Sequence, residues 1–177
     1  MKYTFDTEYN QHALSAMAKC IYRTSRKSMH IRGIIAISLA VILSLVYTFW
    51  LATGYYAFDF YGILIYALLP YTVLIHIFRS QLSGYRSKKR LIKGTEKVHS
   101  TFDTENADFF VGEAAISKSD FSYETILFIA ETPRYFVFVL SANHGQVYDK
   151  ATLAGGTEAE FREFITAKTN KPIVYVK

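Results

Sequence analysis

Cysteine and catalytic motifs are what this sequence most plainly lacks. Its single cysteine, Cys20, permits no internal disulfide bond, and although basic neighbours lower a thiol pKa, an ordinary small side chain is favoured there. The chain has no Walker motif, no dinucleotide-binding glycine loop and no Gly-x-Ser-x-Gly nucleophile elbow. Its five histidines are scattered, without the spacing of a metal site. We therefore predict no cofactor, no metal and no catalytic residue, and expect that the protein is not an enzyme.

Charged residues are missing from two apolar runs, residues 33–53 and residues 61–78, which residues 54–60 join. Neither run contains an Asp, Glu, Lys or Arg. About twenty helical residues, at ~1.5 Å each, cross the ~30 Å hydrocarbon core of a bilayer. The pattern predicts a two-helix transmembrane hairpin over residues 33–78.

The net charge of +5 is unevenly distributed along the chain. Residues 1–32 and 79–94 are strongly basic, whereas residues 95–177 carry eight basic and twelve acidic side chains. Because basic flanks stay on the cytoplasmic side, we predict a multi-pass protein of the bacterial inner membrane with both termini cytoplasmic. The acidic C-terminal region argues against nucleic acid as a partner, and the lipid bilayer is the expected one. The predicted headgroup contacts are Arg23, Arg26, Lys27, Arg32, Arg79, Arg86, Lys88, Lys89 and Arg90.

Small residues recur at every fourth position of the first run, at Ala36, Ala40 and Ser44. Such a stripe lets two helices approach closely, either within the hairpin, which we favour, or between the copies of a homo-oligomer. In the second run, Pro70 removes one backbone hydrogen bond and predicts a kink. His76 is an ionisable group near the end of that run and raises the alternative of a proton-linked role.

Outside the two runs, the sequence predicts an α+β organisation. Residues 1–7 alternate in polarity like a short strand, a basic helix is expected over residues 8–30, and residues 79–94 resemble a juxtamembrane linker. From residue 95 onward, short strands alternate with turn signals, which predicts a small antiparallel barrel or sandwich. The expected strands are residues 96–102, 107–111, 115–118, 123–130, 134–140 and 146–148.

A helix is expected to close this C-terminal domain. Thr157 and Glu160 have the spacing of a capping box, which marks a helix start. Phe161, Phe164 and Ile165 then share one face and should cover an open end of the sheet. Asn170 and Pro172 should end the helix.

Several segments resemble the YcxB-like family of small bacterial membrane proteins. They are Ser100-Thr-Phe-Asp-Thr-Glu, the stretch from Ser122 to Phe138 with its Tyr-Phe pair, and Val147-Tyr-Asp-Lys followed by Thr157-Glu-Ala-Glu-Phe-Arg-Glu-Phe. Two positions differ, because the family often has Trp where Phe121 falls and Pro where Tyr148 falls. The resemblance implies a pleckstrin-homology-like β domain over residues 95–177, a bent barrel capped by one helix, and it implies no assigned activity.

These observations favour a membrane-anchored binding module, whose β domain recognises a protein partner or peptide. The loops of that domain are the expected contact region, with Arg134, His144 and Tyr148 as candidate residues. The alternative is an oligomeric membrane sensor or small pore element, which the Ala36, Ala40 and Ser44 stripe, Pro70 and His76 suggest.

Overall fold

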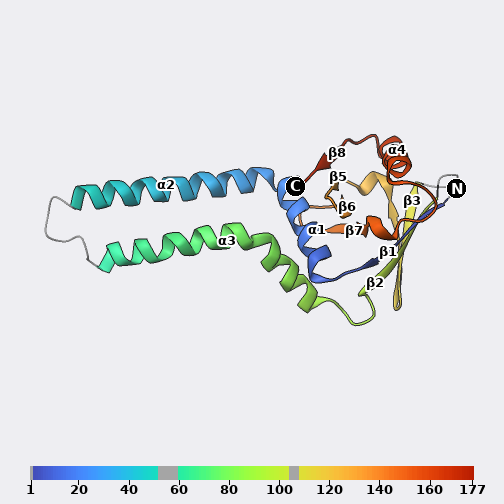
Figure 1. The fold of residues 1–177 in the computed structure, drawn as a ribbon, viewed down its shortest axis with the longest axis horizontal. Coiled ribbons are helices and arrows are strands. Elements are labelled where there is room, and N and C mark those ends of the chain that lie inside the picture. The colour runs from blue at the N-terminus through green and yellow to red at the C-terminus, as the bar shows by residue number, and fades with distance from the viewer. Residues whose placement is uncertain (1, 52–59, 104–107) are drawn as a thin grey trace. The chain divides into compact units, whose positions relative to one another are not determined.

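The computed structural model of the chain describes residues 2–51, 60–103 and 108–177. Within the helices, the side chains of residues 27, 29–30, 47–51, 60–69, 72 and 76 lie outside that description. The chain forms two compact units. The β unit joins Met1–Arg26 to Ser80–Lys177, and the helical unit is Lys27–Arg79 (Figure 1).

The first sheet contains four antiparallel strands in the order β1-β2-β3-β4. They are β1 (Lys2–Glu8), β2 (Lys97–Asp103), β3 (Phe109–Ala114) and β4 (Ser117–Ser122). The predicted N-terminal strand is thus confirmed, and it pairs along its whole length with β2. Side chains alternate between the two faces of a strand, so β1 buries Tyr3, Phe5 and Thr7 on the inner face.

The second sheet has the order β7-β6-β5-β8. Its strands are β5 (Phe128–Glu131), β6 (Tyr135–Val139), β7 (Gly145–Asp149) and β8 (Ile173–Tyr175), and only β8 pairs in parallel, with β5. Every residue of β6 and β7 is buried. A strand that is apolar at consecutive positions, as β6 is, requires cover on both faces.

The inner face of the second sheet packs against the first sheet in an aromatic core. Phe136 and Phe138 contact Phe5, Phe102 and Phe110 from the other sheet. Helix α4 (Glu158–Thr169) adds Phe161 and Ile165, both fully buried in this core. The predicted capping box is confirmed, since the Thr157 hydroxyl accepts from the Glu160 amide and the Glu160 carboxylate accepts from the Thr157 amide.

Helix α1 (Gln11–Arg23) covers the outer face of the second sheet (Figure 1). Ala13, Cys20 and Ile21 pack there against residues such as Val137 and Val147 of β6 and β7. The helix predicted over residues 8–30 is therefore two helices, because α1 ends at Arg23 and the next one begins at Lys27. Burial raises the pKa of the Cys20 thiol to about 12, although Lys19 and Arg23 oppose the shift, so Cys20 is an ordinary core residue.

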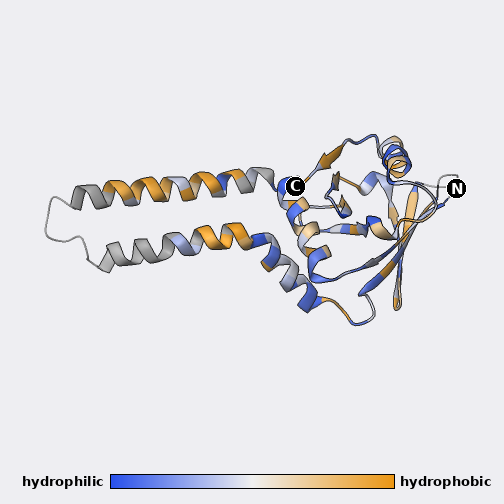
Figure 2. Ribbon diagram, in the orientation of Figure 1, coloured by the Kyte–Doolittle hydropathy of each residue, from blue (hydrophilic) through white to orange (hydrophobic). Residues whose placement is uncertain are grey.

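The helical unit contains α2 (Lys27–Leu51) and the first part of α3 (Phe60–Arg90). Helix α3 continues through Pro70 and through most of the predicted basic linker before it ends at Arg90. The described parts of both helices expose large apolar side chains, including Ile35, Leu45 and Ile77 (Figure 2).

In the parts of the chain that the structure describes, no helix is long and apolar enough to cross a membrane. This finding contradicts the transmembrane hairpin predicted over residues 33–78, the membrane fold class, and the placing of the chain in a bacterial inner membrane with cytoplasmic termini. The finding likewise contradicts the membrane-anchored binding module and the alternative of an oligomeric membrane sensor or small pore element. Residues 47–53, 61–69, 72 and 76 of the predicted runs lie outside the described side chains.

The observed fold is an α+β arrangement of two four-stranded sheets with packed helices. Most predicted strands exist, with shifted ends. The strand expected over residues 123–130 is the exception, because its first part is a short 3-10 turn, Tyr123–Thr125, and only Phe128–Glu131 pairs. A second 3-10 turn, Lys150–Thr152, follows β7.

Candidate functional site

A cavity lies between the two sheets, away from α4. Its volume is about 160 Å³. Strands β2, β3 and β4 supply one wall, and Tyr9 and Gln146 face them from the start of α1 and from β7. We call this region the hollow end of the sandwich. The lining residues are Tyr9, Leu91, Thr95, Val98, Gly112, Ala114, Ser117, Ser119, Phe121 and Gln146.

The hollow end exists because the sequence places small residues at inward positions. Gly112 pairs with Ser119, and Ala114 pairs with Ser117, across β3 and β4. Two pairs further along the same strands, Phe110 opposes Phe121, and their rings stack with centroids 5.3 Å apart. Along this inward face, aromatic rings fill the space between the sheets at Phe110 and Phe121, and the space is open two residues away, at Gly112 and Ser119.

Gln146 is the most distinctive polar group of the cavity. It is only 8% exposed, and its Oε1 accepts from the hydroxyls of Tyr9 at 3.4 Å and Tyr148 at 3.5 Å. Both distances are long for O–H···O bonds. Among the described residues, the structure gives the Nε2 amide group no hydrogen-bond acceptor. The Nε2 group is open to the cavity, since among the described residues the buried side-chain atoms without a partner are the hydroxyls of Tyr123 and Tyr135. A ligand acceptor there would take the place of water.

The remaining polar lining is uncharged. Thr95, Ser117 and Ser119 contribute hydroxyls, and none of the described lining residues is Asp, Glu, Lys, Arg or His. Burial raises the pKa of Tyr9 to about 12, against an opposing backbone hydrogen bond at Val147, so its hydroxyl is protonated at neutral pH. The cavity has hydrogen-bonding groups on an apolar wall and no base beside its serines. Such an arrangement supports the binding of an uncharged ligand.

Two exposed apolar side chains stand next to the cavity, and we call them the rim. Ile92 is 68% exposed and Ile116 is 62% exposed. Ile116 packs against Gly94, where φ is +92° and a Cβ would lie 3.0 Å from the Ile116 side chain. Leu91, Thr95, Ala114 and Ser117, the neighbours of these residues in the chain, line the cavity.

A charged cluster joins β5 to α4, and its charged side chains pair with one another. Glu131 accepts from Lys150 and, at 2.9 and 2.7 Å, from Arg162, while Glu158 on α4 also accepts from Arg162 at 2.7 Å. Burial alone would raise the pKa of Glu131, but the hydrogen bonds from Arg162 and Lys150 hold it below its ordinary value. Each of these charges already has a partner, so the cluster fixes α4 on the sheet.

The predicted contact residues of the β domain do not meet at one site. Tyr148 is 1% exposed and packs in the aromatic core, so its predicted place in an exposed loop is wrong. Arg134 precedes β6 and binds Asp149 at 2.9 Å, whereas His144 is exposed after the opposite end of β6. Tyr148 is buried because β1 and α4 cover the inner face of β7.

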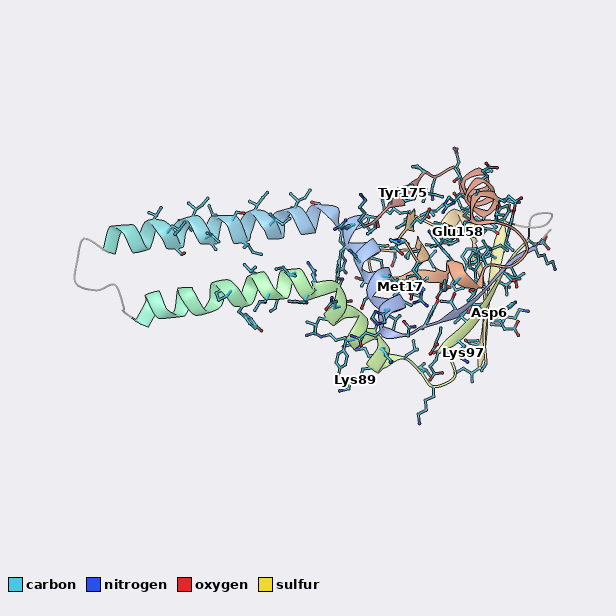
Figure 3. All side chains as sticks on the ribbon, in the orientation of Figure 1. Asp6, Met17, Lys89, Lys97, Glu158 and Tyr175 are labelled. Carbon is cyan, nitrogen blue, oxygen red and sulfur yellow. The ribbon has the colours of Figure 1, made fainter. Side chains whose placement is uncertain are left out.

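The other predicted residues lie on the helices. Of the stripe in α2, Ser44 is buried and Ala36 and Ala40 are exposed, as is Pro70 in α3. Lys89 projects from the last turn of α3 (Figure 3), and four basic residues there, Arg86, Lys88, Lys89 and Arg90, are all exposed. Arg23 ends α1 and Arg26 follows it, while Lys27 and Arg32 belong to α2 and Arg79 to α3.

Sequence reasoning missed the residues of the cavity. The signal available was the alternation of small residues at Gly112, Ala114, Ser117 and Ser119 inside an otherwise aromatic domain. Within the described residues, no cluster of His, Cys, Asp or Glu is suited to hold a metal ion. No protein-family model, curated protein or solved structure matches the chain.

Proposed function

We propose that this chain is a non-catalytic binding domain. It takes an uncharged group of ring size, bearing a hydrogen-bond acceptor, into the cavity between its sheets. The observation that carries the proposal is the Gln146 amide, which is more than nine-tenths buried, lines the cavity, and has a donor without an acceptor in the described chain.

Size and charge define the class of ligand. An apolar cavity of about 150 Å³ holds a benzene molecule, so a space of about 160 Å³ accommodates one ring. Leu91, Val98 and Phe121 supply apolar contact for such a ring. A charged ligand would lose its hydration without gaining an opposite charge, since no described lining residue is ionised at neutral pH.

The test is a titration of the full-length, 15N-labelled chain with p-cresol, followed by NMR. We expect p-cresol to shift the signals of the Gln146 side-chain amide and the Gly112 backbone amide. Benzoate, which has a similar ring and a charge, should leave them unmoved. The Gly112→Leu variant places a side chain in the cavity and should abolish the shifts, while Ala115→Leu, in the exposed turn beside it, should retain them. Equal binding by the two variants, or no shift at all, overturns the proposal.

The resemblance to the YcxB-like family remains a prediction. The antiparallel first sheet, the antiparallel pairs of β5, β6 and β7, and the capping helix α4 support it for the β domain. A protein partner, a possible homo-oligomer, the exclusion of nucleic acid and the absence of enzymatic activity are likewise predictions. The acidic C-terminal region supports the exclusion of nucleic acid.

A further inference from the structure

Strand β4 is the edge of the first sheet, and the hydrogen-bonding pattern shows which of its groups are free. The amide of Tyr123 donates to the carbonyl of Asp108, so residues 123, 121, 119 and 117 are the ones that bond β3. The alternate residues Lys118 and Asp120 therefore direct their N–H and C=O groups away from β3. In the described part of the chain no backbone partner meets them.

The same strand lines the cavity with its other residues. Ser117 and Ser119 point to the inner face, where the hollow end begins. In an antiparallel pair, residues that lie opposite each other place their side chains on the same face of the sheet. A strand added to β4 would thus carry the side chain opposite Ser119 to the cavity.

We propose that the natural ligand is an extended peptide strand that pairs antiparallel with β4 and inserts a tyrosine side chain into the cavity. This inference rests on the proposed function. The tyrosine ring matches the size of the cavity and its apolar lining, and its hydroxyl oxygen accepts from the Gln146 amide. Backbone hydrogen bonds to Lys118 and Asp120 hold the peptide, which is the usual division of labour in strand addition.

The outer face of β4 defines the neighbours of that tyrosine. Lys118 and Asp120 carry opposite charges on that face. Opposite charges directly across two strands stabilise a pair. An antiparallel peptide therefore has a basic residue before the tyrosine, facing Asp120, and an acidic residue after it, facing Lys118.

The experiment compares two blocked peptides with p-cresol on the full chain, by calorimetry or NMR. The first peptide is Ac-Thr-Val-Lys-Tyr-Glu-Val-Thr-NH2, and the second exchanges its Lys and Glu. We expect the first to bind at least tenfold more tightly than p-cresol and several-fold more tightly than the second. Replacing its Tyr by Ala should weaken binding at least tenfold.

Two matched variants test the strand addition itself. Asp120→Pro removes one free edge N–H and the carboxylate, and proline is tolerated on an edge strand, whereas Asp120→Ala removes the carboxylate alone. We expect Asp120→Pro to lose most of the peptide's advantage over p-cresol. Asp120→Ala should lose only the several-fold part that depends on the charge pair, and both variants should bind p-cresol as the wild type does. Urea unfolding of each variant serves as the folding control.

The outcomes separate the two proposals. If p-cresol binds and Asp120→Pro holds the peptide as tightly as Asp120→Ala does, strand addition is wrong and the cavity proposal stands. If the peptide binds no more tightly than p-cresol, the same conclusion holds. If p-cresol binds nowhere and Gly112→Leu leaves peptide binding unchanged, the cavity proposal is wrong and the peptide inference fails with it.

Discussion

The two ends of the sandwich are built on the same strands and differ in what their inward side chains do. At the end that α4 closes, Phe5, Phe102, Phe110 and Phe161 interlock, with ring centroids 4.9–5.8 Å apart. At the hollow end, Gly112 and Ser119 occupy equivalent inward positions and leave space. The comparison shows that strand pairing does not require a filled interior along its whole length. The filled end provides stability, and the hollow end is free for a ligand.

The largest expected effect is at the filled end. Phe161 is fully buried, and Phe161→Ala should lower the free energy of unfolding by about 3–5 kcal/mol, because it removes contacts and leaves a cavity. The matched control is Phe109→Ala, since Phe109 is 51% exposed and should cost less than about 1 kcal/mol. Urea denaturation measures both. Similar losses for the two variants would mean that the filled end does not dominate stability.

The charged cluster that fixes α4 should come next. Glu131→Gln removes the buried carboxylate that Lys150 and Arg162 share and leaves them the more exposed Glu158, and should cost about 2 kcal/mol at neutral pH. In the folded protein the pKa of Glu131 lies below 4.5, so its contribution is present above that pH and is lost as the pH falls through the folded pKa. Unfolding curves at several pH values should show this loss in the wild type and not in the variant. A loss of equal slope in both would assign the effect to other carboxylates.

Gly84 should show a smaller effect that distinguishes tight packing from open space. A Cβ at Gly84 would lie 2.7 Å from the backbone nitrogen of Ser15, so the end of α3 touches α1 there. Gly84→Ala should therefore destabilise the β unit by about 1–3 kcal/mol, through overpacking. The thermal unfolding midpoint is the measurement. An unchanged midpoint would show that the two helices separate at little cost.

The smallest expected effect is at Gly112, the matching glycine of the hollow end. A Cβ there meets Phe121 at 3.4 Å and Val98 at 3.8 Å, which are ordinary contacts. Gly112→Ala should change stability by less than about 1 kcal/mol, and the unfolded-state entropy favours a gain. Gly112→Ala should also weaken p-cresol binding modestly, whereas Gly112→Leu should abolish it. A destabilisation equal to that of Gly84→Ala would contradict the open cavity.

Local patterns predicted the parts of the fold that depend on neighbours in the chain. The capping box at Thr157 and the buried face of Phe161 and Ile165 follow from spacing alone, and the structure confirms them. The helices α2 and α3 also coincide with the apolar runs, but the inference from apolar run to membrane span is contradicted. Hydropathy describes a segment and does not describe what surrounds it.

The site depended on contacts between distant segments, which a sequence pattern does not contain. Tyr148 is predicted among exposed loop residues, but it is buried because β1 and α4 cover it. Whether Gly112 leaves a cavity depends on Gln146 of the opposite sheet, 34 positions along. Sequence reasoning misses such residues because the order of the strands in the two sheets determines what surrounds them.

The pairing of β1 with β2 also determines the order in which the molecule is completed. These two strands share seven residue pairs, yet residues 9–96 separate them in the chain. At about 5–20 residues per second of synthesis, the first strand waits several seconds for its neighbour. Closing so long a loop costs little more free energy than closing a shorter one, because the cost grows only with the logarithm of length. Strand β1 therefore joins its sheet only after the whole helical unit has been made.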